Sequence, residues 1–401
     1  MDTAIVMEEK TLKEVRVGVI GVGNIGYMHA TNLFENKILG MKLTAVCDIK
    51  GSRLAHCSRC FPGIRYYQNY IELIKSKTVD AVIISVPHKL HAKIAMEALK
   101  EGLHVLVEKP IDITVTAAKE LLAVAEKSNK IFAIMFNQRT NSLFQKAHDI
   151  VQGGLLGEIK RSVWIVTNWY RSQAYYNSGD WRATWSGEGG GVLLNQAPHN
   201  LDLWQWVCGM PVSVTAFCNV AKYHDIDVED EAIIYTKYKN DATGVFITST
   251  GEYPGTNRFE ISGDRGKMVL ENSTLKWWRL VESEREICYT SEVSFPEIKC
   301  EYQEFTADRK ESGHIGIIQN FANAIMYGER LIAPGAEGIN ELMISNAAYL
   351  SQWNGNTEIE IPFDSKQFDC LLEKQNDKFR KISYISAENI GENLKRWQVR
   401  W

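Results

Sequence analysis

The sequence lacks the features that mark membrane, secreted and nucleic-acid-binding proteins. No apolar stretch approaches the roughly 20 residues that a helix needs to cross a bilayer, and the first ten residues carry three acidic side chains without an apolar signal core. Lys and Arg number 45 against 49 Asp and Glu, with no basic run, which argues against a nucleic-acid partner. We therefore expect a cytoplasmic protein that binds neither membranes nor nucleic acid.

The sequence also lacks a cysteine pattern typical of disulfide-bonded or zinc-binding proteins. The eight cysteines are spread over the whole chain without a compact framework, as is typical of proteins with reduced thiols. Cys57 and Cys60 form a C-x-x-C pair, but no second pair or nearby histidine at ligand spacing completes a zinc site. We expect structural or incidental thiols and no metal ion.

Glycine, in contrast, is concentrated where an apolar run ends. Residues 15–20 have the composition of a buried strand and lead into a Gly-x-Gly-x-x-Gly motif at 21–26. In a dinucleotide-binding turn, the first glycine permits the tight turn, the second lets the backbone approach the pyrophosphate, and the third lets the helix pack on the strand. We predict that the cofactor lies against this turn and the helix N-terminus behind it, at Gly21, Gly23, Asn24 and Ile25.

Asp48 completes the dinucleotide motif. It closes a second apolar run, 42–47, and lies 22 residues after Gly26. An acidic side chain at this place accepts hydrogen bonds from the ribose 2′-hydroxyl and repels a 2′-phosphate, so the predicted cofactor is NAD. Lys50 and Arg53 are near enough in sequence to leave some tolerance for NADP.

The first third of the chain alternates short apolar runs with helical segments. Such alternation predicts a doubly wound parallel sheet covered on both faces, and we place this Rossmann domain at residues 1–136. The expected strands are 15–20, 42–47, 81–85, 104–107 and 131–136, and the expected helices are 25–35, 70–76, 91–101 and 114–128. Ligands of such sheets bind beyond the carboxyl ends of the strands. The unusual residues that we expect at those ends, facing the cofactor, are Ser85, Pro87, Glu108, Lys109, Asn137 and Gln138.

The rest of the chain, 137–401, has a different pattern. Strand-like segments joined by short turns predict a large, mostly antiparallel sheet with one face left to solvent or a partner, hence an α+β domain. The expected strands are 161–168, 212–221, 231–238, 244–250, 258–262, 267–271 and 275–280, with helices at 313–327 and 338–352. The last residues, 394–401, contain two tryptophans and three basic residues, which favours a docked tail or a subunit contact.

Lys109 is a candidate catalytic residue. It follows an apolar strand, in Glu108-Lys109-Pro110, where partial burial makes the proton of an ammonium easier to lose. Pro110 restricts the backbone of Lys109 and is compatible with a cis bond. The alternative is an ordinary surface lysine beside a loop proline.

A second candidate constellation runs from Gly189 to Asp202. Three successive glycines allow a ligand to approach the backbone, and Asn195 and His199 share a face if the segment is helical, with Asp202 three residues further on. Histidine suits general acid–base work near neutral pH. A purely structural histidine at the start of an apolar helix is the alternative.

An aromatic and arginine-rich segment precedes these glycines. Aromatic faces suit the C–H faces of sugars or an aromatic aglycone, and arginine donates hydrogen bonds to hydroxyls or phosphate. A packed cluster at a domain or subunit interface is an equally good interpretation. The candidate substrate residues are Tyr170, Arg171, Tyr176, Trp181 and Arg182.

Taken together, these residues resemble the Gfo/Idh/MocA family (glucose-fructose oxidoreductase, inositol dehydrogenase and relatives) from about Val15 to Trp353. The resemblance implies a nicotinamide cofactor, hydride transfer to or from a ring carbinol, and an open-faced sheet used for homo-oligomerisation. It also implies that Lys109 and His199 are the catalytic pair, with Asn195 and Asp202 at the substrate. Its markers are the 21–26 motif with His29, Asp80 to Ile84, Pro87 with His91 at the cofactor, Glu108-Lys109-Pro110, and Gly189 to Asp202.

One departure from the family narrows the expected substrate. Inositol dehydrogenases usually carry an aspartate four residues before the histidine, where this chain has Asn195. The Asn-Gln-x-x-His form and the aromatic loop look more like members that oxidise the C3 hydroxyl of glucosides, some of them ahead of a separate lyase. We expect that reaction. The alternatives are an inositol or free-sugar dehydrogenase, an NAD-dependent redox glycosidase, and a non-catalytic sugar or NAD sensor.

Overall fold

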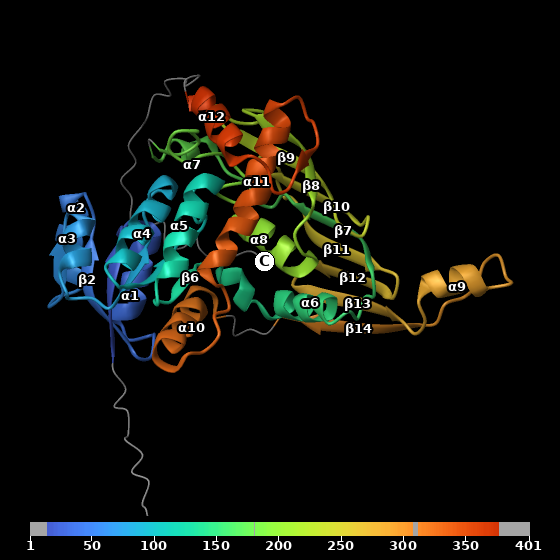
Figure 1. The fold of residues 1–401 in the computed structure, drawn as a ribbon, viewed down its shortest axis with the longest axis horizontal. Coiled ribbons are helices and arrows are strands. Elements are labelled where there is room, and N and C mark those ends of the chain that lie inside the picture. The colour runs from blue at the N-terminus through green and yellow to red at the C-terminus, as the bar shows by residue number, and fades with distance from the viewer. Residues whose placement is uncertain (1–13, 180, 308–311, 377–401) are drawn as a thin grey trace, which may run out of the picture.

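The computed structural model describes residues 14–179, 181–307 and 312–376 (Figure 1). The C-terminal tail expected to dock, 394–401, lies outside these residues. Within them, no helix combines the length and the apolar character needed to cross a membrane.

The N-terminal domain is the predicted doubly wound sheet. Its six strands are parallel in the order β3-β2-β1-β4-β5-β6: β1 (Val15–Ile20), β2 (Met41–Cys47), β3 (Arg65–Tyr67), β4 (Ala81–Ile84), β5 (His104–Val107) and β6 (Phe132–Ile134). The helices are α1 (Asn24–Phe34), α2 (Gly51–Cys60), α3 (Tyr70–Lys75), α4 (His91–Lys100) and α5 (Val115–Lys127). Helices cover both faces, so β4 and β5 are buried almost throughout.

Two elements of this domain were not predicted. Strand β3 has three residues and sits at the edge of the sheet, too short to give a periodic signal. Helix α2 buries only Leu54 and Cys57, so its apolar face is too narrow to stand out in the sequence.

The second domain is the predicted open sheet. It has nine strands in the order β14-β13-β12-β11-β7-β10-β9-β8-β15, with β7 and β10 parallel and the other neighbours antiparallel. Burial alternates along β9, β10 and β11, as expected when one face is covered. The strands are β7 (Ile159–Val166), β8 (Ser213–Val220), β9 (Glu229–Lys237), β10 (Thr243–Ser249), β11 (Asn257–Gly263), β12 (Gly266–Glu271), β13 (Thr274–Leu280), β14 (Cys300–Thr306) and β15 (Ile359–Glu360).

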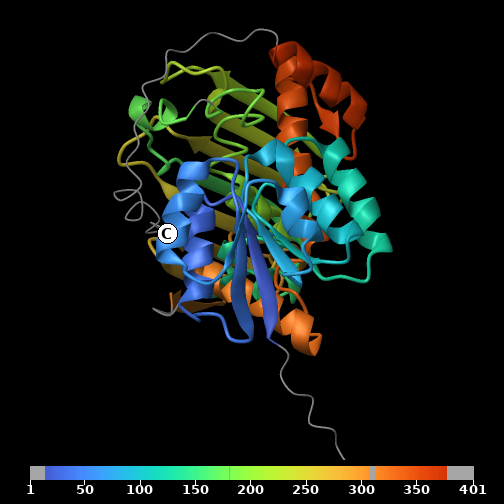
Figure 2. The ribbon, with the colours of Figure 1, turned by 90° about the vertical axis from the view of Figure 1, so that its left-hand side faces the viewer.

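Helices join the two domains (Figure 2). Helix α11 packs on β8, on α8 and on α5 of the first domain, while α10 lies against the first domain, where Gln319 bonds the backbone of Leu39 at 2.8 and 3.2 Å. The chain therefore returns to its first domain late in the sequence. The helices of this region are α6 (Ser142–Gln152), α8 (Pro198–Cys208), α10 (Gly313–Tyr327), α11 (Gly338–Trp353) and α12 (Ser365–Asn376).

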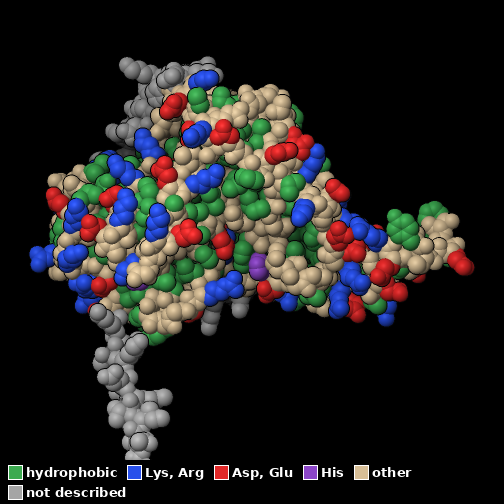
Figure 3. Space-filling model, in the orientation of Figure 1, with side chains coloured by type: hydrophobic (Ala, Val, Ile, Leu, Met, Phe, Trp, Pro, Cys, Tyr) green, Lys and Arg blue, Asp and Glu red, His purple; other side chains and the backbone are tan. Residues whose placement is uncertain are grey.

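Helix α9 (Glu284–Thr290) forms an arm between β13 and β14 that projects from the body. Ion pairs Glu284–Lys160 (2.7 Å) and Arg285–Glu158 (2.5 Å) fix its base. Hydrophobic side chains gather at its far end (Figure 3), and Phe295 in this arm is 92% exposed.

Candidate active site

The glycine turn after β1 fits a dinucleotide. Gly21 has φ +88°, and a Cβ placed there would lie 2.5 Å from the carbonyl oxygen of Ser85. A Cβ at Gly26 would lie 1.8 Å from the carbonyl oxygen of Gly21. Helix α1 starts at Asn24 without a side-chain cap, which leaves its first N–H groups for an anion such as a pyrophosphate. Only glycine fits this turn.

Asp48 lies at the end of β2, facing the glycine turn. Its carboxylate is nearly buried and accepts hydrogen bonds from the backbone N–H of Val22 (3.0 Å) and Lys50 (2.9 Å). Arg53 donates to it at 3.0 Å, and the Arg53 guanidinium lies 3.8 Å from a Cβ built on Gly23. The predicted ribose acceptor therefore has a cation beside it, close to the turn.

The carboxyl end of β5 carries a chain of ionisable groups. Glu108 contacts His29 Nε2 of α1 at 2.8 Å, and the ring of His314 lies 5.6 Å from that of His29. Burial opposes the charge on Glu108, but the hydrogen bond from His29 and the nearby cationic groups lower its pKa to about 2. Burial lowers the pKa of His314 to about 4. Glu108 is thus a carboxylate at neutral pH.

The other predicted cofactor residues lie around these strand ends. Ser85 donates to the Gly21 carbonyl at 2.9 Å. His91, almost wholly buried, has its two ring nitrogens 2.7 and 2.8 Å from the carbonyls of Pro110 and Val86, so it braces the loops after β4 and β5. The remaining residues are Pro87, before the turn 88–90, and Asn137 and Gln138, which are buried in the turn 137–140.

Lys109 reaches across to the second domain. Its Nζ donates to the backbone carbonyl of Asn195 at 2.9 Å, and the Lys109–Pro110 bond is cis. Burial lowers the pKa of Lys109, while the charges of Glu108, Glu341 and Glu188 oppose that shift. The ammonium is therefore held between the domains, which the sequence did not reveal.

His199 stands on the first turn of α8, close to Lys109. Burial and the Lys109 charge lower the pKa of His199 well below its ordinary value, so the imidazole is neutral at neutral pH. Its Nδ1 is buried without a hydrogen-bond partner in the described parts of the chain, and its ring meets Phe136 edge-on at 6.5 Å. A neutral imidazole can accept a proton.

Asn195 does not share a helical face with His199. Pro198 occupies the first turn of α8, and residues 191–197 form turns instead, because proline favours the first helical turn and lacks the N–H needed further in. The Asn195 amide donates to Tyr175 Oη at 3.1 Å and to the carboxylate of Glu188.

Asp202 lies in the interior. Arg139 binds both of its oxygens, at 2.9 and 2.6 Å, and both side chains are almost completely buried. Arg139 also contacts Glu337. The structure thus places this predicted substrate residue in an ion pair between α8 and the turn after β6.

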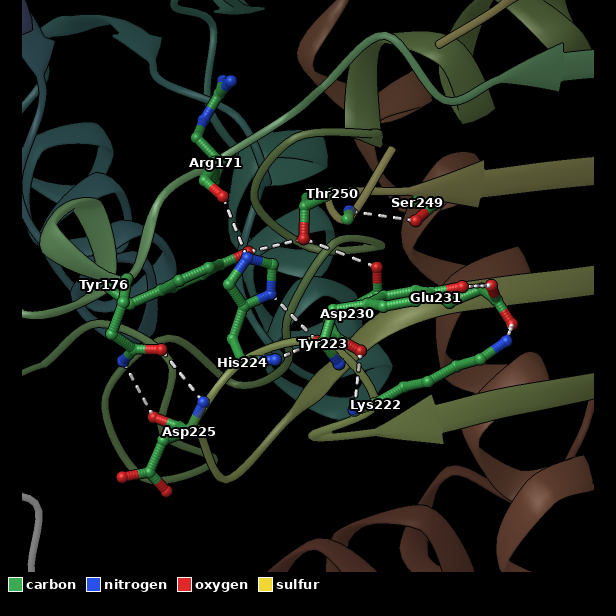
Figure 4. Close-up of polar contacts among 12 residues, drawn as sticks. Arg171, Tyr176, Lys222, Tyr223, His224, Asp225, Asp230, Glu231, Ser249 and Thr250 are labelled. Carbon is green, nitrogen blue, oxygen red and sulfur yellow. Dashed lines mark hydrogen bonds and ion pairs between the residues drawn. The ribbon is translucent and has the colours of Figure 1, made fainter. Parts of the chain in front are cut away.

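The aromatic segment is anchored at its base by a polar cluster (Figure 4). His224 Nε2 lies 2.9 Å from the Arg171 carbonyl and Nδ1 lies 3.0 Å from Asp230. The hydroxyl of Tyr176 meets Thr250 at 2.7 Å. Tyr176 is therefore buried and anchors this segment, and its role at the substrate stays a prediction.

The other predicted substrate residues are less enclosed. Tyr170 is half exposed and packs edge-on against Tyr253. Trp181 meets His88 at 5.6 Å. Arg171 and Arg182 lie over the ring of Tyr175 at 5.1 and 4.7 Å, and Arg182 also donates to the Tyr175 hydroxyl at 2.8 Å.

Sequence reasoning did not assign roles to Glu188, Tyr175 or Arg139. Glu188 stands directly before the glycine run and Tyr175 within the aromatic segment, which were the available signals. Arg139 follows the predicted cofactor pair at 137–138, but its partner is 63 residues away, and no local pattern identifies such a pair.

Comparison with known proteins agrees with this architecture. Residues 15–136 match the oxidoreductase family with an NAD-binding Rossmann fold, and residues 144–269 match the GFO/IDH/MocA C-terminal domain. Myo-inositol 2-dehydrogenase of Thermotoga maritima is 25% identical over 83% of this chain and 95% of that protein. An uncharacterised oxidoreductase of Schizosaccharomyces pombe is 31% identical over 64% of this chain and 70% of that protein.

A solved structure has the same fold. The WlbA dehydrogenase of Chromobacterium violaceum, in complex with NADH and UDP-GlcNAcA, is 25% identical with a TM-score of 0.76 over 90% of this chain and all of that one. The two family matches fall on the two domains described above. The chain therefore belongs to the Gfo/Idh/MocA family and is an NAD-dependent oxidoreductase.

Proposed function

We propose that this protein oxidises a ring hydroxyl of a sugar, glycoside or polyol with Lys109 and His199 as the catalytic pair. The observation that carries the proposal is a contact between the domains: Lys109, at the carboxyl end of a Rossmann strand, bonds the carbonyl of Asn195, four residues before His199. The Lys109 charge and burial keep that histidine neutral. The names of the inositol dehydrogenase and of the WlbA complex support a polyol or sugar substrate.

The mechanism assigns one task to each side chain. NAD, when bound, supplies the hydride acceptor. His199 removes the proton of the reacting hydroxyl while hydride leaves its carbon, which becomes a carbonyl. Lys109 hydrogen-bonds the oxygen as negative charge develops on it. The Asn195 carbonyl holds the ammonium in place.

We further propose that the substrate is a glucoside. The protein oxidises it at C3, and a separate lyase then removes its aglycone. Support comes from the aromatic and arginine side chains of the segment before the glycine run, namely Tyr170, Arg171, Trp181 and Arg182. Of these, Arg182 bonds the Tyr175 hydroxyl that the Asn195 amide also contacts. Inositol oxidation is a second candidate, favoured by the length over which the inositol dehydrogenase matches.

Product analysis separates these candidates. The protein is incubated with NAD and, in parallel, an aryl O-glucoside, an aryl C-glucoside, glucose and myo-inositol. A product lighter by two hydrogens with its aglycone attached supports glucoside oxidation. Oxidised inositol or glucose alone refutes it, and aglycone release without net NADH indicates a redox glycosidase.

Two substitutions test the catalytic pair. Lys109→Met and His199→Asn should each lower turnover by on the order of a hundredfold and leave NAD binding, followed by fluorescence titration, near the parent value. Near-normal turnover in both variants refutes the assignment.

We also propose that the open face of the nine-stranded sheet forms a homo-oligomer contact. Phe217, Ile233 and Tyr235 on β8 and β9 are 51%, 38% and 39% exposed there, and apolar side chains gathered on one face favour association. Sedimentation of a Phe217→Glu, Tyr235→Glu variant should show smaller particles; an unchanged size contradicts the proposal.

A further inference from the structure

A carboxylate that the catalytic assignment leaves unused lies behind Asn195. Glu188 is 1% exposed. Its Oε2 accepts a hydrogen bond from the backbone N–H of Ala183 at 2.7 Å, and its Oε1 contacts the Asn195 amide. Arg182 approaches Oε1 at 3.8 Å. A buried charge that is paired and hydrogen-bonded in this way is expensive to disturb.

Asn195 connects this carboxylate to Lys109. The side-chain amide of Asn195 donates to Glu188, and the backbone carbonyl of the same residue accepts from Lys109 at 2.9 Å. The hydroxyl of Tyr175 takes a second contact from the amide at 3.1 Å. The position of the carbonyl that holds Lys109 is therefore set by what the Asn195 side chain binds.

The same network includes one more donor. Gln196 Nε2 lies 3.2 Å from the Tyr175 hydroxyl, and Gln196 Oε1 is buried without a partner among the described residues. The phenol oxygen of Tyr175 therefore lies within hydrogen-bonding distance of three N–H donors, on Arg182, Asn195 and Gln196.

We propose that Glu188 and Asn195 act as one unit, in which Glu188 holds the Asn195 amide and thereby positions the carbonyl that accepts the Lys109 ammonium. Glu188 is a positioning residue: it acts on Lys109 through Asn195. This inference rests on the proposed catalytic role of Lys109. An aspartate at 195 would place two carboxylates in contact in the interior, so the two positions are coupled.

The directions of the pKa shifts of Lys109 and Glu188 agree with this geometry. The charge of Glu188 raises the pKa of Lys109 against the effect of burial. Burial in turn raises the pKa of Glu188, while Arg182 and the bonds from Ala183 and Asn195 oppose that shift. Removing the carboxylate therefore makes the lysine lose its proton at lower pH.

Three variants test the coupling: Glu188→Gln, Asn195→Asp and the double variant. We expect Glu188→Gln to lower kcat by on the order of tenfold with little change in KM, and the alkaline limb of its pH profile to move to lower pH. Asn195→Asp should lose more, because it adds a second buried carboxylate. The double variant, which exchanges acid and amide, should recover at least tenfold over Asn195→Asp.

Controls keep the outcomes distinct. Glu231→Gln removes a carboxylate bonded to Lys222 and Tyr223 outside this network and should keep the parent pH profile. A Glu188→Gln variant with parent kcat and pH profile overturns the inference, as does a double variant no better than Asn195→Asp. An active Lys109→Met variant instead overturns the proposed function. If Glu188→Gln does not fold, the comparison of Asn195→Asp with the double variant still decides.

Discussion

Replacing Asp202 with asparagine tests whether this residue holds the fold or the substrate. Its carboxylate is 1% exposed and both oxygens are bound by Arg139, a side chain with no exposed surface. Asparagine keeps the shape but removes the charge, so among the described residues Glu337 remains as the anionic partner of Arg139. We expect a loss of stability rather than a loss of substrate affinity.

The expected loss of stability in Asp202→Asn follows from the burial of the ion pair. Breaking a buried ion pair by removing one partner costs about 3–5 kcal/mol, because the remaining charge stays in the interior. Since Glu337 still neutralises part of the Arg139 charge, we expect about 3 kcal/mol for Asp202→Asn. The double variant Arg139→Met, Asp202→Leu removes both charges and should be more stable than Asp202→Asn.

Denaturant unfolding followed by tryptophan fluorescence measures these differences, and the KM for substrate is measured on the same samples below the unfolding transition. A purely structural Asp202 predicts a lower unfolding midpoint with KM within about threefold of the parent. The reasoning is refuted if Asp202→Asn unfolds at the parent midpoint while KM rises tenfold or more.

Three further predictions concern the first domain. Asp48→Ser removes the negative charge beside Arg53 and should shift the kcat/KM ratio toward NADP by on the order of tenfold; an unchanged ratio contradicts the role of Asp48. Gly26→Ala, whose Cβ would lie 1.8 Å from a carbonyl oxygen, should abolish measurable NAD binding. Gly63→Ala strains a φ of +87° but has nothing within 4 Å, so it should lower stability and still bind NAD. Burial lowers the pKa of His104 from 6.5 to about 4, so the unfolded chain takes up a proton first and stability falls as the pH drops from 6.5 toward 4. A pKa shift of that size corresponds to about 3 kcal/mol of stability, and we expect about half of it because the His104 ring is partly exposed. The His104→Gln variant should therefore lose less stability than the parent between pH 6.5 and 4, as measured by urea titrations at several pH values.

The elements that the sequence predicts best have strong local signals. Strands β1 and β5 and helix α10 begin and end at the predicted residues, because each is a clear apolar run or stripe bounded by polar or glycine residues. Strand β14 was missed because six of its seven residues are exposed, so it has no buried alternation to detect. Helix α9 buries no residue at all.

The sequence predicts the part of the candidate site that lies at the strand ends, but not the contact between the two domains. The rule that ligands lie beyond the carboxyl ends of parallel strands brings Asp48, Glu108 and Lys109 to one edge from the sequence alone. The contact between Lys109 and Asn195 depends on how two domains pack. No periodicity in the sequence reports that packing, and none reports the ion pair of Asp202 with Arg139, 63 residues away.

The acceptor of the Lys109 ammonium is a peptide oxygen, and every amino acid has one. No point substitution at position 195 deletes that anchor, although many alter the polarity around it. An exchange of amide for acid at 195 therefore keeps the acceptor of the lysine and has to be matched by a change at Glu188, which contacts that side chain. The peptide oxygen that binds Lys109 is thus present whichever side chain stands at 195, and that side chain can change while the oxygen stays.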